Sequence, residues 1–88
     1  MRLLKFSGRE AAVLRAIDFA TGTEGGEILV KTRLEAPEAV DIINGLIDVG
    51  YIETNPPRPG HVEIPGFGET IFEVNPAFAH QLRKSLVR

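Results

Sequence analysis

The stretch Glu38–Glu53, EAVDIINGLIDVGYIE, determines how this chain folds. Its apolar residues recur at the i, i+3, i+4, i+7 spacing of one helix face; they are Ala39, Val40, Ile42, Ile43, Leu46, Ile47 and Val49. Gly50 stands where a helix ends in a left-handed residue, a conformation that costs glycine little. Tyr51 and Ile52 favour a strand. The sequence therefore predicts a helix over residues 37–49 that buries one side and turns directly into a strand.

Upstream, the residues from Ser7 to Glu10 have the spacing of a capping box and predict a helix over residues 7–20. The glycine-rich residues 21–26 (TGTEGG) predict a flexible connector, since no Gly-Lys-Ser/Thr follows to hold phosphate. Residues 27–34 fit a strand by their alternation and also fit a short helix. We favour the helix, because Pro37 then opens the next helix after a short turn.

Downstream, residues 51–74 predict a β-hairpin with a long connection. Its second strand is expected at 69–74, where Thr70, Phe72 and Val74 share a face. Three prolines within NPPRPG (55–60) exclude regular structure there, and residues 61–64 are expected to pair only briefly. The pair Asn75-Pro76 then supplies a cap and a first position for a last helix, over residues 76–87.

The composition limits the classes of function. Eighty-eight residues without cysteine predict one domain, 1–88, held by an apolar core without a disulfide or a thiolate metal site. A cysteine-free chain fits a cytoplasmic location, and no apolar run reaches the roughly 18 residues of a membrane helix. We expect no metal and no cofactor, because the two histidines, His61 and His80, lack the spacing of ligands. No nucleophile motif is present, so we expect no enzyme.

Two segments give the chain a family resemblance. Leu46–Glu53 (LIDVGYIE) is similar to the junction between recognition helix and wing in many bacterial regulators. Phe72–Pro76 (FEVNP) is similar to a second wing strand that runs into a terminal helix. From about Ser7 to Leu86 the chain resembles a winged helix-turn-helix. The resemblance implies an α+β fold with three helices, a two- to three-stranded wing and a C-terminal helix.

The resemblance also implies DNA binding, with the third helix in the major groove and the wing on the backbone. The charge departs from this pattern, because residues 35–53 contain five acidic residues and no basic one, which opposes contact with phosphate. The solvent side of the central helix is expected to show Glu38, Asp41, Asn44, Gly45 and Asp48. Asn44 could read adenine. The other candidate contacts to nucleic acid are Lys31, Arg33, Arg58 and His61, with the loop tip 58–61 as the favoured contact.

Two hypotheses follow from these residues. The first is a DNA-binding transcription regulator that acts as a homodimer, with an interface formed by Leu3, Leu4, Phe6, Phe78, Leu82 and Leu86. Residues 1–6 of that set fit either an extended arm or a first helical turn. The second is a protein-interaction module without DNA binding, whose acidic helix meets a basic partner through Glu38, Asp41 and Asp48.

Overall fold

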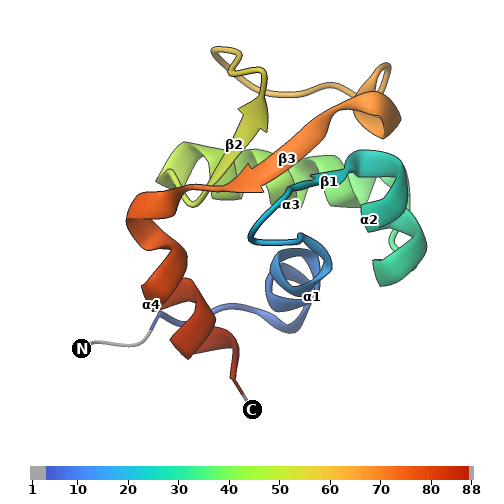
Figure 1. The fold of residues 1–88 in the computed structure, drawn as a ribbon. Helices are drawn as coiled ribbons and strands as arrows, with labels where there is room; N and C mark the ends of the chain where they lie inside the picture. Colours follow the sequence, from blue (N-terminus) through green and yellow to red (C-terminus); the bar gives the residue numbers. More distant parts are fainter. Residues whose placement is uncertain (1–3, 88) are drawn as a thin grey trace.

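The computed structural model describes residues 4–87 of the chain. Within this range the fold is α+β, with four α-helices, one 3₁₀ turn and a three-stranded antiparallel sheet. In chain order the elements are α1 (Gly8–Ala16), β1 (Thr23–Glu24), α2 (Gly25–Thr32), α3 (Ala36–Val49), β2 (Ile52–Asn55), η1 (Phe67–Glu69), β3 (Ile71–Val74) and α4 (Pro76–Leu86). Figure 1 shows α3 running behind the sheet, with α1 below it and α2 and α4 toward opposite sides.

The central helix α3 forms as its sequence predicts. Pro37 lies in its first turn, and its inner side is buried in the core at Ala39, Val40, Ile43 and Leu46. Ile43 is fully buried and Leu46 is 2% exposed. Gly50 ends the helix in the left-handed region, with φ 96°, and its N–H donates to the Leu46 and Ile47 carbonyls. The expected transition into a strand follows two residues later, where β2 begins.

The sheet has the order β1-β3-β2, so β3 pairs on both sides. Thr54 of β2 and Thr23 of β1 both lie opposite Phe72 in the register. The prediction of a flexible connector over residues 21–26 is wrong, because Thr23 and Glu24 form a strand there. Glycine is needed at position 25 because the backbone of Phe67 lies against it: a Cβ on Gly25 would stand 2.1 Å from the Phe67 carbonyl oxygen.

The first two helices are displaced from their predicted bounds. Helix α1 has the expected capping box but ends at Ala16, not at residue 20. Asp18 forms a tight turn instead: its carboxylate accepts from the Ala20 and Thr21 N–H groups, and its own N–H donates to Thr23 Oγ1. The two backbone donors also lower the pKa of Asp18 below its ordinary value. Helix α2 is a helix and not the alternative strand, and it begins two residues earlier than expected.

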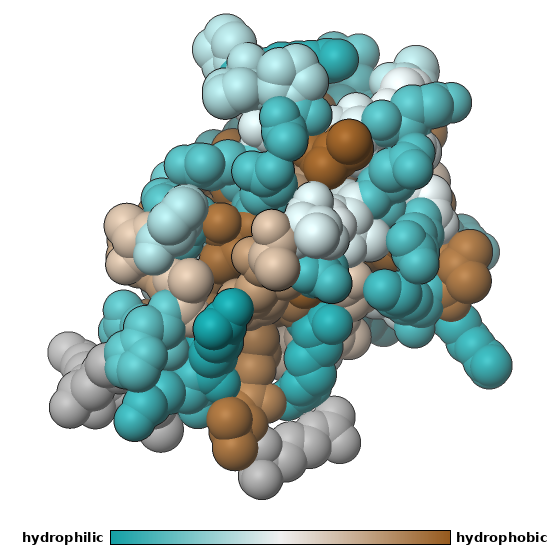
Figure 2. Space-filling model, in the orientation of Figure 1, coloured by the Kyte–Doolittle hydropathy of each residue, from teal (hydrophilic) through white to brown (hydrophobic). Residues whose placement is uncertain are grey.

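The core is made by one apolar cluster shared by helices and strands. Its largest fully buried members are Phe67, Phe72, Leu14, Ile28, Ile43, Ile52, Leu82 and Val13. Helix α4 closes the cluster, with Asn75 as its cap: the Asn75 side chain accepts from the Ala77 N–H and donates to the Gly50 carbonyl. On the face in Figure 2, hydrophobic residues appear as patches divided by hydrophilic side chains.

Substitution by alanine should change the stability of the protein in opposite directions at Gly45, inside α3, and at Gly50, which caps its end. Gly50→Ala should lower the free energy of unfolding by about 1–2 kcal/mol, because alanine is strained at positive φ. Gly45→Ala should raise it by about 0.5–1 kcal/mol, because Gly45 is exposed within the helix and a Cβ there meets no atom within 4 Å. Urea unfolding of both variants measures the two changes. A Gly45→Ala variant that is less stable than the unchanged chain would contradict the view that Gly45 is an exposed helical position with room for a side chain.

Candidate functional site

The outer face of α3 is the strongest candidate for a binding surface. It consists of Glu38, Asp41, Asn44, Gly45 and Asp48, as the sequence predicts. Asp41, Gly45 and Asp48 are exposed, whereas Glu38 and Asn44 are half-buried. The helix carries three carboxylates here and no basic residue, so its own charge on this face is negative.

One flank of the outer face is occupied by the β2–β3 loop, residues 56–70. Asn44 Nδ2 donates to the Val62 carbonyl at 3.0 Å, and the Val62 N–H donates to Asn44 Oδ1 at 2.8 Å. One turn further, His61 Nε2 lies 2.7 Å from Asp48 Oδ1. Residues 61–64 therefore form no strand, contrary to the brief pairing expected for them. The loop is held by the side chain of Asn44 instead of by strand pairing. Asn44 uses both ends of its amide on this loop.

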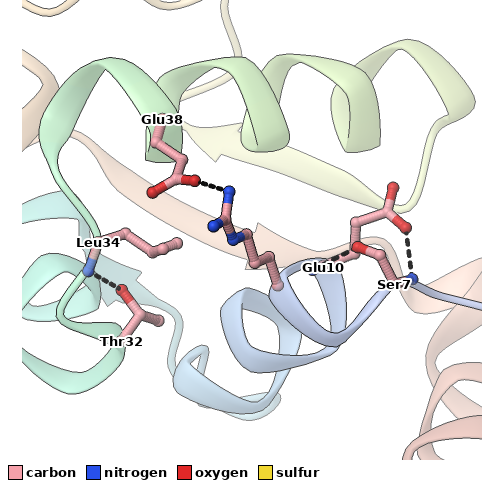
Figure 3. Close-up of polar contacts among 6 residues, drawn as sticks. Ser7, Glu10, Thr32, Leu34 and Glu38 are labelled. Atoms are coloured by element: carbon pink, nitrogen blue, oxygen red, sulfur yellow. Dashed lines mark hydrogen bonds and ion pairs between the residues drawn. The ribbon is translucent and has the colours of Figure 1, made fainter.

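The other flank of the outer face meets the start of α1. Glu38 points from α3 toward this turn (Figure 3), where it forms an ion pair with Arg9. Arg9 is 29 positions away in sequence and carries no signal of this contact. The side chains of Glu38 and Arg9 are 34% and 70% exposed, so the pair is worth little as a stabilising contact. Asp41 has no ion pair within the described residues and keeps its charge uncompensated.

The predicted basic contacts do not form one surface. Lys31 and Arg33 lie at the end of α2, which follows the edge strand β1, whereas Arg58 and His61 belong to the loop after the opposite edge strand, β2. Lys31 Nζ lies 3.7 Å from Glu27 Oε1 and donates to the Ala16 carbonyl oxygen at 3.4 Å. Arg58 is exposed, and its backbone N–H is held by Thr54 Oγ1. The chain thus presents these four basic residues toward separate edges of the sheet.

The residues expected at a dimer interface pack mainly within the chain itself. Leu82 is fully buried, so it cannot belong to a subunit surface in this conformation, and that part of the prediction is corrected. Phe6, Tyr51 and Phe78 form edge-to-face contacts, with ring centroids 5.7 and 5.1 Å apart. Leu4 and Leu86 also pack against the core, and the Leu4 N–H donates to Ser85 Oγ. Leu3 lies outside the described residues. The oligomeric state remains a prediction.

A polar hollow of about 220 Å³ lies under the β2–β3 loop and is lined by Thr54, Arg58 and Thr70 among others. Residues 4–87 contain no group of three or more His, Asp or Glu placed to hold a metal ion. None of the helices in this range is long and apolar enough to cross a membrane. Searches of protein-family models, curated proteins and solved structures find no match to the chain.

Removal of the Asn44 amide should release the β2–β3 loop. Asn44→Ala loses both hydrogen bonds to Val62 and should lower the free energy of unfolding by about 1–2 kcal/mol. Hydrogen exchange of the Val62 N–H should accelerate more than exchange at the sheet. The control is Asp48→Ala, which removes only the exposed contact with His61 and should cost less than about 1 kcal/mol. If the Val62 N–H exchanges at the same rate in Asn44→Ala as in the unchanged chain, the two hydrogen bonds of Asn44 do not hold the loop.

Proposed function

We propose that this chain is a winged-helix-type binding module without enzymatic activity, and that the outer face of α3 binds a basic region of a partner protein. The element order supports the first part of the proposal: a helix, a short strand, two helices, a long hairpin and a terminal helix. The family resemblance of residues 46–53 and 72–76 implies this order of helices and hairpin, without the short strand. A cytoplasmic location is part of the proposal, as expected for a chain without cysteine.

The observation that carries the second part is the charge of α3. Asp41 and Asp48 are exposed two turns apart on the same side of the helix, and no Lys or Arg occurs anywhere in it. Complementary charge steers association and selects among partners, and this helix selects for a basic one. His61 lies against Asp48 but is itself exposed, and the carboxylate of Asp41 is uncompensated.

The same features argue against a helix that reads bases in the major groove. Protein–DNA affinity depends strongly on neutralised phosphates, and the carboxylates of α3 would approach phosphates of like charge. Asn44, the residue that would bind adenine, already donates and accepts with Val62. The β2–β3 loop covers one flank of the helix, so groove entry would require this loop to leave.

The test compares two charge reversals of equal size. The first double variant, Asp41→Lys/Asp48→Lys, reverses two charges on the outer face of α3. The second, Glu24→Lys/Glu69→Lys, reverses two exposed charges elsewhere and is the control. A fluorescent lysine-rich peptide should bind the unchanged chain at about 0.1 M salt, where the Debye length of about 10 Å is shorter than the protein. The first double variant should weaken binding about tenfold, and the second should weaken it much less, because local charge pairs act over about one Debye length. Equal loss in both variants would show a response to net charge alone and would refute the proposal.

DNA binding is the second candidate, and exposed Arg58 favours it. This side chain has no ion pair within the described residues, and three prolines stiffen the surrounding loop. If the loop contacts phosphate, a random 20-base-pair duplex should be retarded in a gel at low salt, and Arg58→Ala should reduce retardation. Lys31→Ala, at the other edge of the sheet, is the comparison variant. No retardation at high protein concentration would exclude this candidate.

A further inference from the structure

A partly exposed apolar stripe runs along α3 beside its carboxylates. It consists of Ile42, Gly45 and Val49, whose i, i+3, i+7 spacing places them on one side of the helix. Ile42 is half-buried against the core, whereas Gly45 is exposed and Val49 is 58% exposed. The stripe therefore passes from the core to the surface, and its second half is left uncovered by the described chain.

Gly45 has no role in the packing of the chain itself. Glycine weakens a helix interior relative to alanine, so its presence calls for a reason. The other central glycines have one, since Gly50 adopts a positive φ and Gly25 is pressed against Phe67. At Gly45 the backbone is helical and a Cβ would meet nothing within 4 Å. What glycine supplies at this position is close access to the helix backbone from outside.

The first two residues of the stripe also form a wall of a groove, and Val49 lies beyond its end. This groove, of about 470 Å³, lies between α3 and the start of α1, and Ile42 and Gly45 line it on the α3 side. Arg9 lines the opposite side, but its charge is matched by Glu38. Asp41 and Glu10 also line the groove and have no ion pair within the described residues, and Asp48 carries the same sign two turns along α3 from Asp41.

We infer that this groove binds a basic amphipathic α-helix of a partner protein. The inference rests on the proposed function and specifies the partner for the same surface. A helix laid along α3 offers anchors at the same i, i+3/i+4, i+7 period as the stripe, which an extended peptide does not. Its small or aliphatic residues pack on Gly45 and Val49, and its Lys and Arg residues lie beside Asp41 and Asp48. Charge complementarity selects this occupant over an acidic or neutral helix.

The test uses two synthetic peptides of identical composition, rich in Lys, Leu and Ala. One orders these residues into an amphipathic helix, and the other is scrambled so that no apolar face forms. Fluorescence anisotropy measures their binding to the full chain and to three variants. Gly45→Leu adds four carbons to the stripe, Gly45→Ala adds one while favouring the helix, and Ala77→Leu adds three carbons at an exposed position of α4.

The amphipathic peptide should bind more tightly than the scrambled one. Gly45→Leu should weaken it about tenfold, Gly45→Ala less, and Ala77→Leu not at all. Equal binding of both peptides, or of Gly45→Leu and the unchanged chain, would overturn the helix inference. The proposed function still stands in that case if reversal of Asp41 and Asp48 abolishes binding, and it fails if neither peptide binds. Self-association that Gly45→Leu abolishes would identify a second copy as the occupant and also overturn the inference.

Discussion

The left-handed turn at Gly50 is the constraint on which the other contacts depend. It reverses the chain within two residues, so that the inner side of α3 and the buried residues of β2, Ile52 and Thr54, face the same core. The carbonyl of Gly50 then receives the Asn75 side chain, and the Tyr51 carbonyl receives the Asn75 N–H. One turn thereby fixes the helix, the sheet and the start of α4 relative to each other, and it keeps the opposite side of α3 outside the core.

Elements with local chemical signals could be predicted from the sequence. The capping box at Ser7, Pro37 at the start of α3, Gly50 at its end and the Asn75 cap all act within a few residues, and all are found. Strand β1 could not be predicted in this way. Two residues have no periodicity of their own, and Thr23 and Glu24 become a strand only because β3 pairs with them. The early end of α1 has the same origin, since the Asp18 turn is completed by Thr23.

The candidate surface was predictable in its charge but not in its surroundings. The acidic run of residues 35–53 and the helical period together place the carboxylates on the outer face. The contact of Asn44 with Val62 joins residues 18 positions apart, and no pattern marks either partner. The burial of Leu82, which was expected at a subunit interface, was missed for a related reason: counting apolar residues cannot show that Leu4 and Phe6 return to pack beside α4 and Tyr51. Long-range packing decides such cases.

The β2–β3 loop is anchored at two interior points, Val62 against Asn44 and Phe67 in the core, and these anchors divide its length unequally. The segment around Pro59 and Gly60 lies outside both anchors and is exposed. The entropic cost of closing a loop rises only slowly with its length. This tip can therefore be lengthened, or can carry a fluorophore, while the anchored segments keep their positions. It offers a reporter position next to α3 that leaves the proposed binding face itself chemically unaltered.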